Sequence, residues 1–283
     1  MVQNPIEPIE QPSGKNADYE NFPVGSWLLP KHLRPHIMVF YAFARAIDDI
    51  ADSPTLSADE KTSRLDGFAR HLDSIIDYEP GYEKATAMRV SLSATGVTTA
   101  HCHDLITAFK QDAKQNRYES WDDLLGYCQL SAAPVGRYLI DLHGGCADSY
   151  ASSDALCAAL QVLNHLQDLG DDLAELDRVY MPMAWIRAAH ISETDFGLRV
   201  CSAGTRQVID RALDGVDGLL VQAQMVSKNI HSWRLGMEAS VILAIAHSLR
   251  SKLGRHDPLA GRIVLTKPAL ALCGMRGILS AII

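Results

Sequence analysis

The sequence contains no apolar run of the roughly 18 to 20 residues that a membrane-spanning helix needs. It contains neither of the common glycine-rich phosphate loops, GxGxxG and GxxxxGKS or GxxxxGKT, and no GxSxG nucleophile motif. No run of alternating apolar and polar residues indicates a strand, and no repeat of about 20 to 50 residues is present. These absences argue against a nucleotide cofactor and favour an all-helical chain.

Cysteine is sparse and shows no metal-binding spacing. None of the six cysteines forms a CxxC pair, and most lie in apolar surroundings, which predicts reduced thiols in a cytoplasmic protein. The formal net charge of -8 argues against a nucleic-acid partner. The 283 residues, 47% of them hydrophobic, suffice for a substantial core.

The first distinctive stretch is residues 161–172, QVLNHLQDLGDD. Its polar residues Asn164, Asp168 and Asp172 stand four apart, and Gln161 lies one turn earlier. In a helix this spacing places one amide and two carboxylates on one face. The residues just before it are small and apolar, which predicts a helix buried by its neighbours.

A second acidic stretch, residues 41–52 (YAFARAIDDIAD), has the same spacing. Asp48 and Asp52 stand four apart, Asp49 lies beside them, and Arg45 is one turn upstream. Burying two like charges on one helix face is costly, so two such pairs require a cation between them. Carboxylate and amide oxygens suit Mg²⁺, which often bridges to phosphates. The alternative is that these acids lie on solvated helix faces.

Basic and aromatic residues near these stretches are candidates for substrate binding. Arg45 and Arg178 are predicted to contact a diphosphate, whereas a salt bridge explains Arg137. A salt bridge from Arg45 to Asp49, one turn away, is the competing explanation for Arg45. Tyrosine and phenylalanine rings near the polar motifs either line an apolar cavity and stabilise a carbocation or simply pack in the core. The histidines, including His165, are expected to be structural.

Helical patterns cover most of the chain after an acidic, proline-containing lead, residues 1–13, that is predicted to be disordered. Helices are expected over about 33–52, 57–76, 84–95, 100–114, 192–227 and 231–253, and another contains Asp168 and ends near Asp177. Ser120 is expected to begin a helix that SAAPVGRY, residues 131–138, either kinks or ends in a loop. The final stretch, PALALCGMRGILSAII, is either a core helix or a peripheral contact with a membrane.

Five segments carry a resemblance to a known family. In chain order these are ENFPVGSWLLP, YAFARAIDDIAD, YCQLSAAPVGRY, LQVLNHLQDLGDD and DRVYMP, which span about residues 14 to 185. They resemble the squalene and phytoene synthases, the head-to-head prenyl synthases. Within that family, the opening motif and the SAAPVG segment resemble the bacterial enzymes that form hydroxysqualene for hopanoid biosynthesis. The resemblance implies one all-α isoprenoid-synthase helical bundle, residues 14–283, around a central active-site cavity.

The resemblance also implies roles for individual residues. Tyr127 would stand near the leaving diphosphate and the developing cation. Mg²⁺ would be held by Asp48, Asp52, Asn164, Asp168 and Asp172. The isoprenoid diphosphate would be bound by Tyr41, Arg45, Gln161 and Gln167. Arg178 and Tyr180, from DRVYMP, and Phe22, from the opening motif, complete the candidate substrate-binding set.

The implied reaction is the Mg²⁺-dependent conversion of presqualene diphosphate to hydroxysqualene, with water captured and no NADPH needed. Two departures bear on it: the family's usual VAG is Ser131-Ala132-Ala133-Pro134 here, and its frequent Arg before Asp168 is Gln167. The alternative reaction is condensation of two farnesyl diphosphates. A non-catalytic interaction protein is the other alternative. The presence of Asp48, Asp52, Asp168 and Asp172 weighs against it. Contact with neighbouring pathway enzymes is a further expectation.

Overall fold

The structure of the protein, a computed structural model, describes residue 9 and residues 26–73 and 79–282. Within these residues it has helices and no strand, apart from an isolated bridge between Arg117 and Val179, so the all-α prediction is confirmed. The α-helices are α1 (Arg34–Asp52), α2 (Ala58–Leu72), α3 (Glu83–Thr95), α4 (Ala100–Asp112), α5 (Trp121–Ser131), α6 (Ala133–Leu142), α7 (Tyr150–Gln167), α8 (Leu169–Leu176), α9 (Met183–Ala188), α10 (Ala203–Ala223), α11 (Val226–Asn229), α12 (Trp233–Leu253) and α13 (Lys267–Ile282). Short 3₁₀ turns occupy η2 (Ala147–Ser149), η3 (Glu193–Gly197) and η4 (Pro258–Ala260).

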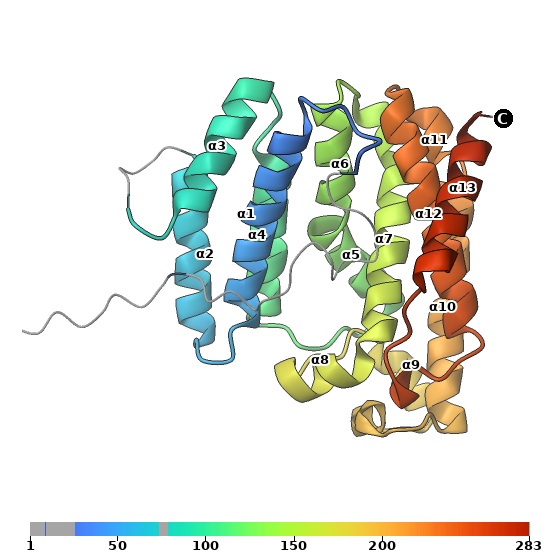
Figure 1. Cartoon of the computed structure of the whole chain (residues 1–283). Helices are drawn as coiled ribbons and strands as arrows, with labels where there is room; N and C mark the ends of the chain where they lie inside the picture. Colours follow the sequence, from blue (N-terminus) through green and yellow to red (C-terminus); the bar gives the residue numbers. More distant parts are fainter. Residues whose placement is uncertain (1–8, 10–25, 74–78, 283) are drawn as a thin grey trace, which may run out of the picture.

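The long helices run side by side along one axis of the molecule (Figure 1). α1 and α7 flank the centre, and α5 and α6 lie behind them. α10, α12 and α13 stand on the side of α7 that faces away from α1. The segment before α1 crosses the upper end of the bundle toward α12, while α8 lies across the lower end. Buried apolar side chains from α1 to α13 join in one continuous core. The domain boundary predicted at residue 14 stays a prediction, since Ile9 is the only one of the first 13 residues that the structure describes.

The buried apolar residues of α1 determine which way its acidic side chains point. Pro35 stands in the first turn, where its missing N–H would have had no helical partner. Phe43, Ile47 and Ile50 are fully buried and fix one side of the helix in the core. Because Asp48 lies on a different side, it projects away from those apolar contacts toward the space beside α7.

The α5–α6 junction contains the predicted kink. Ser120 caps α5 by accepting a hydrogen bond from the Asp123 N–H (3.1 Å), and Asp123 accepts one from the Ser120 N–H (3.0 Å). α5 ends at Ser131, and α6 begins two residues later with Pro134 in its first turn. The chain therefore bends without an intervening loop.

Asp168 interrupts the helix that was predicted to continue to about Asp177. α7 ends at Gln167, Asp168 leaves the helical conformation (φ −109°, ψ 13°), and α8 begins at Leu169. Asp171 and Asp172 then lie in the first turn of α8, where the helix dipole favours negative charge. α8 ends at Leu176, and its C-cap residue Asp177 has a left-handed φ of 51°.

Other predicted boundaries were partly wrong. The helix from residue 57 begins with the expected Ser57–Glu60 capping box but ends at Leu72. The pattern over 192–227 is divided among η3, α10 and α11, because the non-helical residues 198–202 and 224–225 interrupt it. No helix among the described residues is both long enough and apolar enough to cross a membrane.

Candidate active site

A cavity of about 560 Å³ lies between α1, α7 and α12, with α4, α5, α6 and α8 completing its walls. Its two ends differ in chemistry. Acidic side chains from α1, α4, α8 and the α7–α8 junction gather at one end. Apolar side chains line other parts of the wall, among them Leu29, Ile37, Phe40, Val135, Leu139 and Ile242. The cavity thus combines sites for a charged group and for hydrocarbon.

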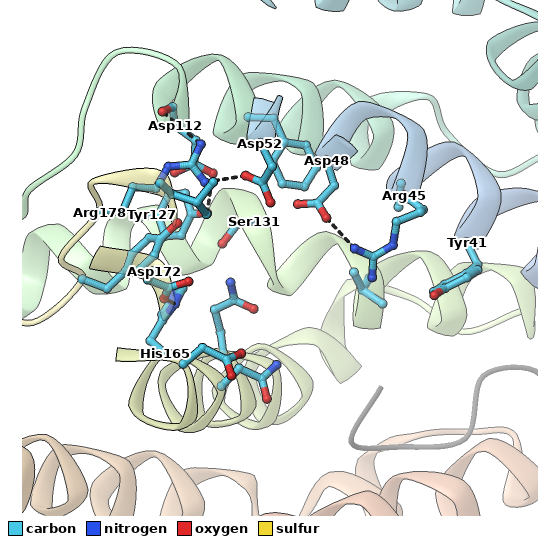
Figure 2. Close-up of a pocket in the computed structure, with 18 of the residues that line it drawn as sticks. Tyr41, Arg45, Asp48, Asp52, Asp112, Tyr127, Ser131, His165, Asp172 and Arg178 are labelled. Carbon is cyan, nitrogen blue, oxygen red and sulfur yellow. Dashed lines mark hydrogen bonds and ion pairs between the residues drawn. The ribbon is translucent and has the colours of Figure 1, made fainter. Parts of the chain in front are cut away.

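Most of the predicted site residues line this cavity. Figure 2 shows Asp48 and Asp52 on one side, with Asp172 and His165 on the opposite side and Tyr127 and Arg178 between them. The acidic faces of α1 and of the α7–α8 junction therefore meet at one space. The predicted residues in the lining are Tyr41, Arg45, Asp48, Asp52, Tyr127, Gln161, Asn164, Asp168, Asp172, Arg178 and Tyr180. Phe22 lies outside the described residues.

Gln167 is the exception among the described candidates, and its predicted substrate contact is not supported by its position. Its side chain is buried outside the cavity lining, and its amide donates a hydrogen bond to the carbonyl of Ile263. Helical phase contributes to this position: six residues turn a helix by about 600°, so Gln167 lies about 120° around α7 from Gln161. It ties α7 to the segment before α13.

Arg45 forms an ion pair with Asp48, not with Asp49 as the competing explanation held. Its Nη1 lies 2.6 Å from Asp48 Oδ2. Burial and the nearby Asp52 charge raise the pKa of Asp48 to about 8, although Arg45 offsets part of the rise. Because 28% of the Asp48 side chain remains accessible, a cation in the cavity can reach it and oppose that rise.

The Arg178 side chain connects the C-terminal ends of α1 and α4. It is 5% exposed, and its Nη1 donates to Asp52 Oδ1 at 2.5 Å. Its Nη2 donates to the carbonyls of Ala51 (3.1 Å) and Asp112 (3.3 Å). A buried guanidinium held in this way supplies fixed positive charge at the polar end of the cavity. Arg137, by contrast, pairs with Asp154 (2.6 Å) and lies outside the lining, as the sequence indicated.

Asp112 is a site residue that sequence reasoning missed. It is 4% exposed and accepts a hydrogen bond from the Tyr127 hydroxyl at 2.7 Å. Burial raises the pKa of Asp112 to about 7, with Arg178 and the Tyr127 bond opposing the rise. Burial, together with the Asp112 charge, holds the pKa of Tyr127 well above its ordinary value, so the phenol stays protonated. The other carboxylate oxygen of Asp112, Oδ1, has no hydrogen-bond partner among the described residues.

Two further residues of the polar end also escaped the sequence prediction. His165, expected to be structural, lines the cavity, stacks on Tyr180 with ring centroids 3.5 Å apart, and lies 3.8 Å from Asp172. Arg262, from the segment before α13, pairs with Asp168 through a 2.8 Å contact. Burial raises the pKa of Asp168, and Arg262 counteracts it.

The donor set fits a magnesium ion that arrives with a phosphate ligand. Among the described residues no three His, Cys, Asp or Glu side chains converge into a preformed cage. Mg²⁺ commonly keeps several waters and uses only one or two carboxylates together with substrate phosphate oxygens. Opposed carboxylates with raised pKa values, at the end of a cavity that also holds Arg45 and Arg178, meet that requirement.

Comparison with known proteins agrees with this geometry. The family model described as squalene/phytoene synthase matches residues 16–269. Two curated hydroxysqualene synthases, from Zymomonas mobilis and Rhodopseudomonas palustris, are each 39% identical to this chain. These alignments cover 93% and 89% of this chain, and 88% and 86% of the relatives.

Solved structures show the same fold. A squalene synthase from Alicyclobacillus acidocaldarius superposes with a TM-score of 0.70 at 29% identity, over 81% of this chain and 85% of that one. A dehydrosqualene synthase superposes with a TM-score of 0.73 at 19% identity, over 92% and 90% of the two chains. The protein belongs to the squalene/phytoene synthase family.

Proposed function

We propose that the protein is a hydroxysqualene synthase, which converts presqualene diphosphate and water to hydroxysqualene and diphosphate. The proposal rests on one agreement between sequence and structure. The chain is about 39% identical to enzymes of that name, and its cavity joins an end rich in acidic and cationic side chains to apolar walls. In the reaction the carbon–oxygen bond to diphosphate breaks, the carbon skeleton rearranges as a cation, and water forms the new carbon–oxygen bond with release of a proton.

The polar end of the cavity binds the diphosphate in this proposal. Arg45 and Arg178 supply positive charge, each already oriented by an aspartate that would otherwise face the leaving group. Residues that would hold magnesium are Asp48, Asp52, Asn164, Asp168 and Asp172. When bound, the metal ion supplies charge neutralisation for the departing diphosphate.

Tyr127 acts as a neutral dipole near the leaving group. Its hydroxyl is fixed by Asp112, so the ring and its oxygen need no reorganisation when charge develops nearby. The adjacent ring of Tyr180, 5.6 Å from that of Tyr127 between centroids, adds a second π face at this end of the cavity.

The apolar wall holds the hydrocarbon arms and limits the access of water to the cation. Phe40, for example, is 4% exposed and stacks on Tyr138 with ring centroids 3.9 Å apart, which gives this wall a rigid backing. Exclusion of water delays capture until the skeleton has rearranged. No NADPH is expected, since this reaction needs no reductant.

A substrate comparison tests the proposal. Purified protein is incubated with Mg²⁺ and either presqualene diphosphate or farnesyl diphosphate, without NADPH, and products are identified by mass spectrometry. Hydroxysqualene from presqualene diphosphate is the expected result. Turnover of farnesyl diphosphate with presqualene diphosphate left untouched would refute it and favour the condensing reaction.

A peripheral membrane contact or a contact with a neighbouring pathway enzyme completes the proposal, because substrate and product are lipids. Leu270, Leu272, Met275 and Leu279 of α13 are exposed apolar side chains. Co-sedimentation with lipid vesicles tests the membrane contact. Binding that is unchanged after deletion of residues 269–283 would place the contact elsewhere.

A further inference from the structure

Glu238 is a buried carboxylate in the cavity wall that the proposed reaction does not use. It lies on α12, lines the cavity and is 3% exposed. Neither of its carboxylate oxygens has a hydrogen-bond partner among the described residues. Burial raises the pKa of Glu238 to about 7. The nearby hydroxyl of Ser26 offsets part of this rise, although its geometry is not that of a hydrogen bond to the carboxylate. An unpaired buried carboxylate is costly, so its retention calls for a functional explanation.

Glu238 lies at the end of the cavity opposite the aspartates. Its neighbour on α12, Arg234, donates a 2.5 Å hydrogen bond to the carbonyl of Leu28, in the segment that crosses the upper end of the bundle (Figure 1). That segment also contains Ser26 and the cavity residue Leu29, and it leads directly into the first turn of α1. Asp48 and Asp52 stand in the last two turns of the same helix.

Helix geometry gives the length of the space between these two ends. Ile37, near the start of α1, and Asp48 both line the cavity and are eleven residues apart. At 1.5 Å per residue their positions differ by about 16 Å along the axis. An extended arm of three isoprene units, with carbon–carbon bonds near 1.5 Å, spans about 15 Å. A three-unit arm that starts at the diphosphate end therefore finishes near Glu238.

We propose that Glu238 determines the length of the prenyl arm that the cavity accepts. This inference rests on the proposed function and names a specificity residue for it. A fourth isoprene unit would press its methyl groups against the carboxylate and exclude water from it, without supplying a hydrogen bond. Leaving a buried polar group unpaired in this way disfavours the longer substrate. Three-unit arms end before that penalty arises.

The test compares presqualene diphosphate with its homologue whose two arms each carry one more isoprene unit. The quantity measured is the ratio of kcat/KM for the shorter substrate to that for the longer one, in the wild type and in Glu238→Leu, Glu238→Gln and Met237→Leu. Leucine removes the polar group, glutamine keeps a polar group of the same shape, and Met237 is the adjacent control outside the cavity lining. A ratio within one preparation is insensitive to a partly unfolded sample.

We expect Glu238→Leu to lower the ratio by roughly 10- to 100-fold, Glu238→Gln to lower it less, and Met237→Leu to leave it at the wild-type value. A ratio within twofold of wild type in Glu238→Leu overturns the inference. So does loss of all product from presqualene diphosphate in folded Glu238→Gln, which would make Glu238 a reacting group. If the wild type uses only farnesyl diphosphate, the proposed function fails, and the ratio for farnesyl against geranylgeranyl diphosphate tests Glu238 separately.

Discussion

Replacing Glu238 by glutamine should stabilise the fold, and increasingly so as the pH rises. The substitution keeps the shape of the side chain and removes only its ability to ionise. Because burial raises the pKa of Glu238 from its ordinary 4.5 to about 7, the folded protein holds a proton that the unfolded chain has already released. Ionisation at this position therefore favours unfolding.

The sign and magnitude follow from linkage between proton binding and folding. Below pH 4.5 both states are protonated and Glu238 has little effect; between pH 4.5 and 7 the stability falls, and above pH 7 the loss is complete. Each pKa unit corresponds to about 1.4 kcal/mol, so the full loss is about 3 kcal/mol. The advantage of the Gln variant in unfolding free energy should grow by about 2 to 3 kcal/mol from pH 5 to pH 8.

Urea unfolding followed by circular dichroism at several pH values measures this difference. Glu60→Gln is the matched control, because the Ser57 capping box lowers the pKa of Glu60 and its stabilisation is present above its unfolded pKa. Because that stabilisation is already present at pH 5, the difference between Glu60→Gln and wild type should stay nearly constant from pH 5 to pH 8. If Glu238→Gln gives the same difference at pH 5 and pH 8, the carboxylate is well solvated and the reasoning fails.

Three other substitutions test the structure. Tyr127→Phe leaves buried Asp112 without its hydrogen bond, so we expect a loss of about 1 to 3 kcal/mol in chemical denaturation and a lower turnover rate. Gly277→Ala should destabilise, because its Cβ would lie 2.5 Å from the Val241 backbone; Gly274→Ala, in open space on the same helix, should not lower the melting temperature. Ser120→Ala removes the cap of α5 and should cost about 1 kcal/mol of unfolding free energy; an unchanged value would contradict the capping assignment.

Local spacing made much of the site predictable. Asp48 and Asp52 on α1 stand four residues apart, as do Asn164 on α7 and Asp168 directly after it, so the helical period predicts that each pair shares one face. Helix capping was readable for the same reason, since Ser57 and Ser120 each precede an acid by three residues. That the two faces meet at one cavity came from the resemblance and from the fold.

Residues that reach the cavity from other elements could not be placed by spacing. Asp112 ends a helix whose sequence resembles any amphipathic helix, and Arg262 lies almost a hundred residues from its partner Asp168. Glu238 did leave a signal, as the lone acid in the apolar helix α12. Helical phase predicts that Gln167 lies off the face of Gln161. Its assignment to the substrate followed the resemblance instead.

Magnesium-dependent binding of inorganic diphosphate tests the central claim that opposed acidic faces grip this group. Isothermal titration with and without Mg²⁺ should show binding only when the metal ion is present. Asp48→Ala and Asp168→Ala, one from each face, should each weaken it by roughly tenfold or more while the circular dichroism stays helical. Asp122→Asn, an exposed position outside the cavity, should bind like wild type. Diphosphate binding that needs no metal ion, or that survives loss of both aspartates, would contradict the account.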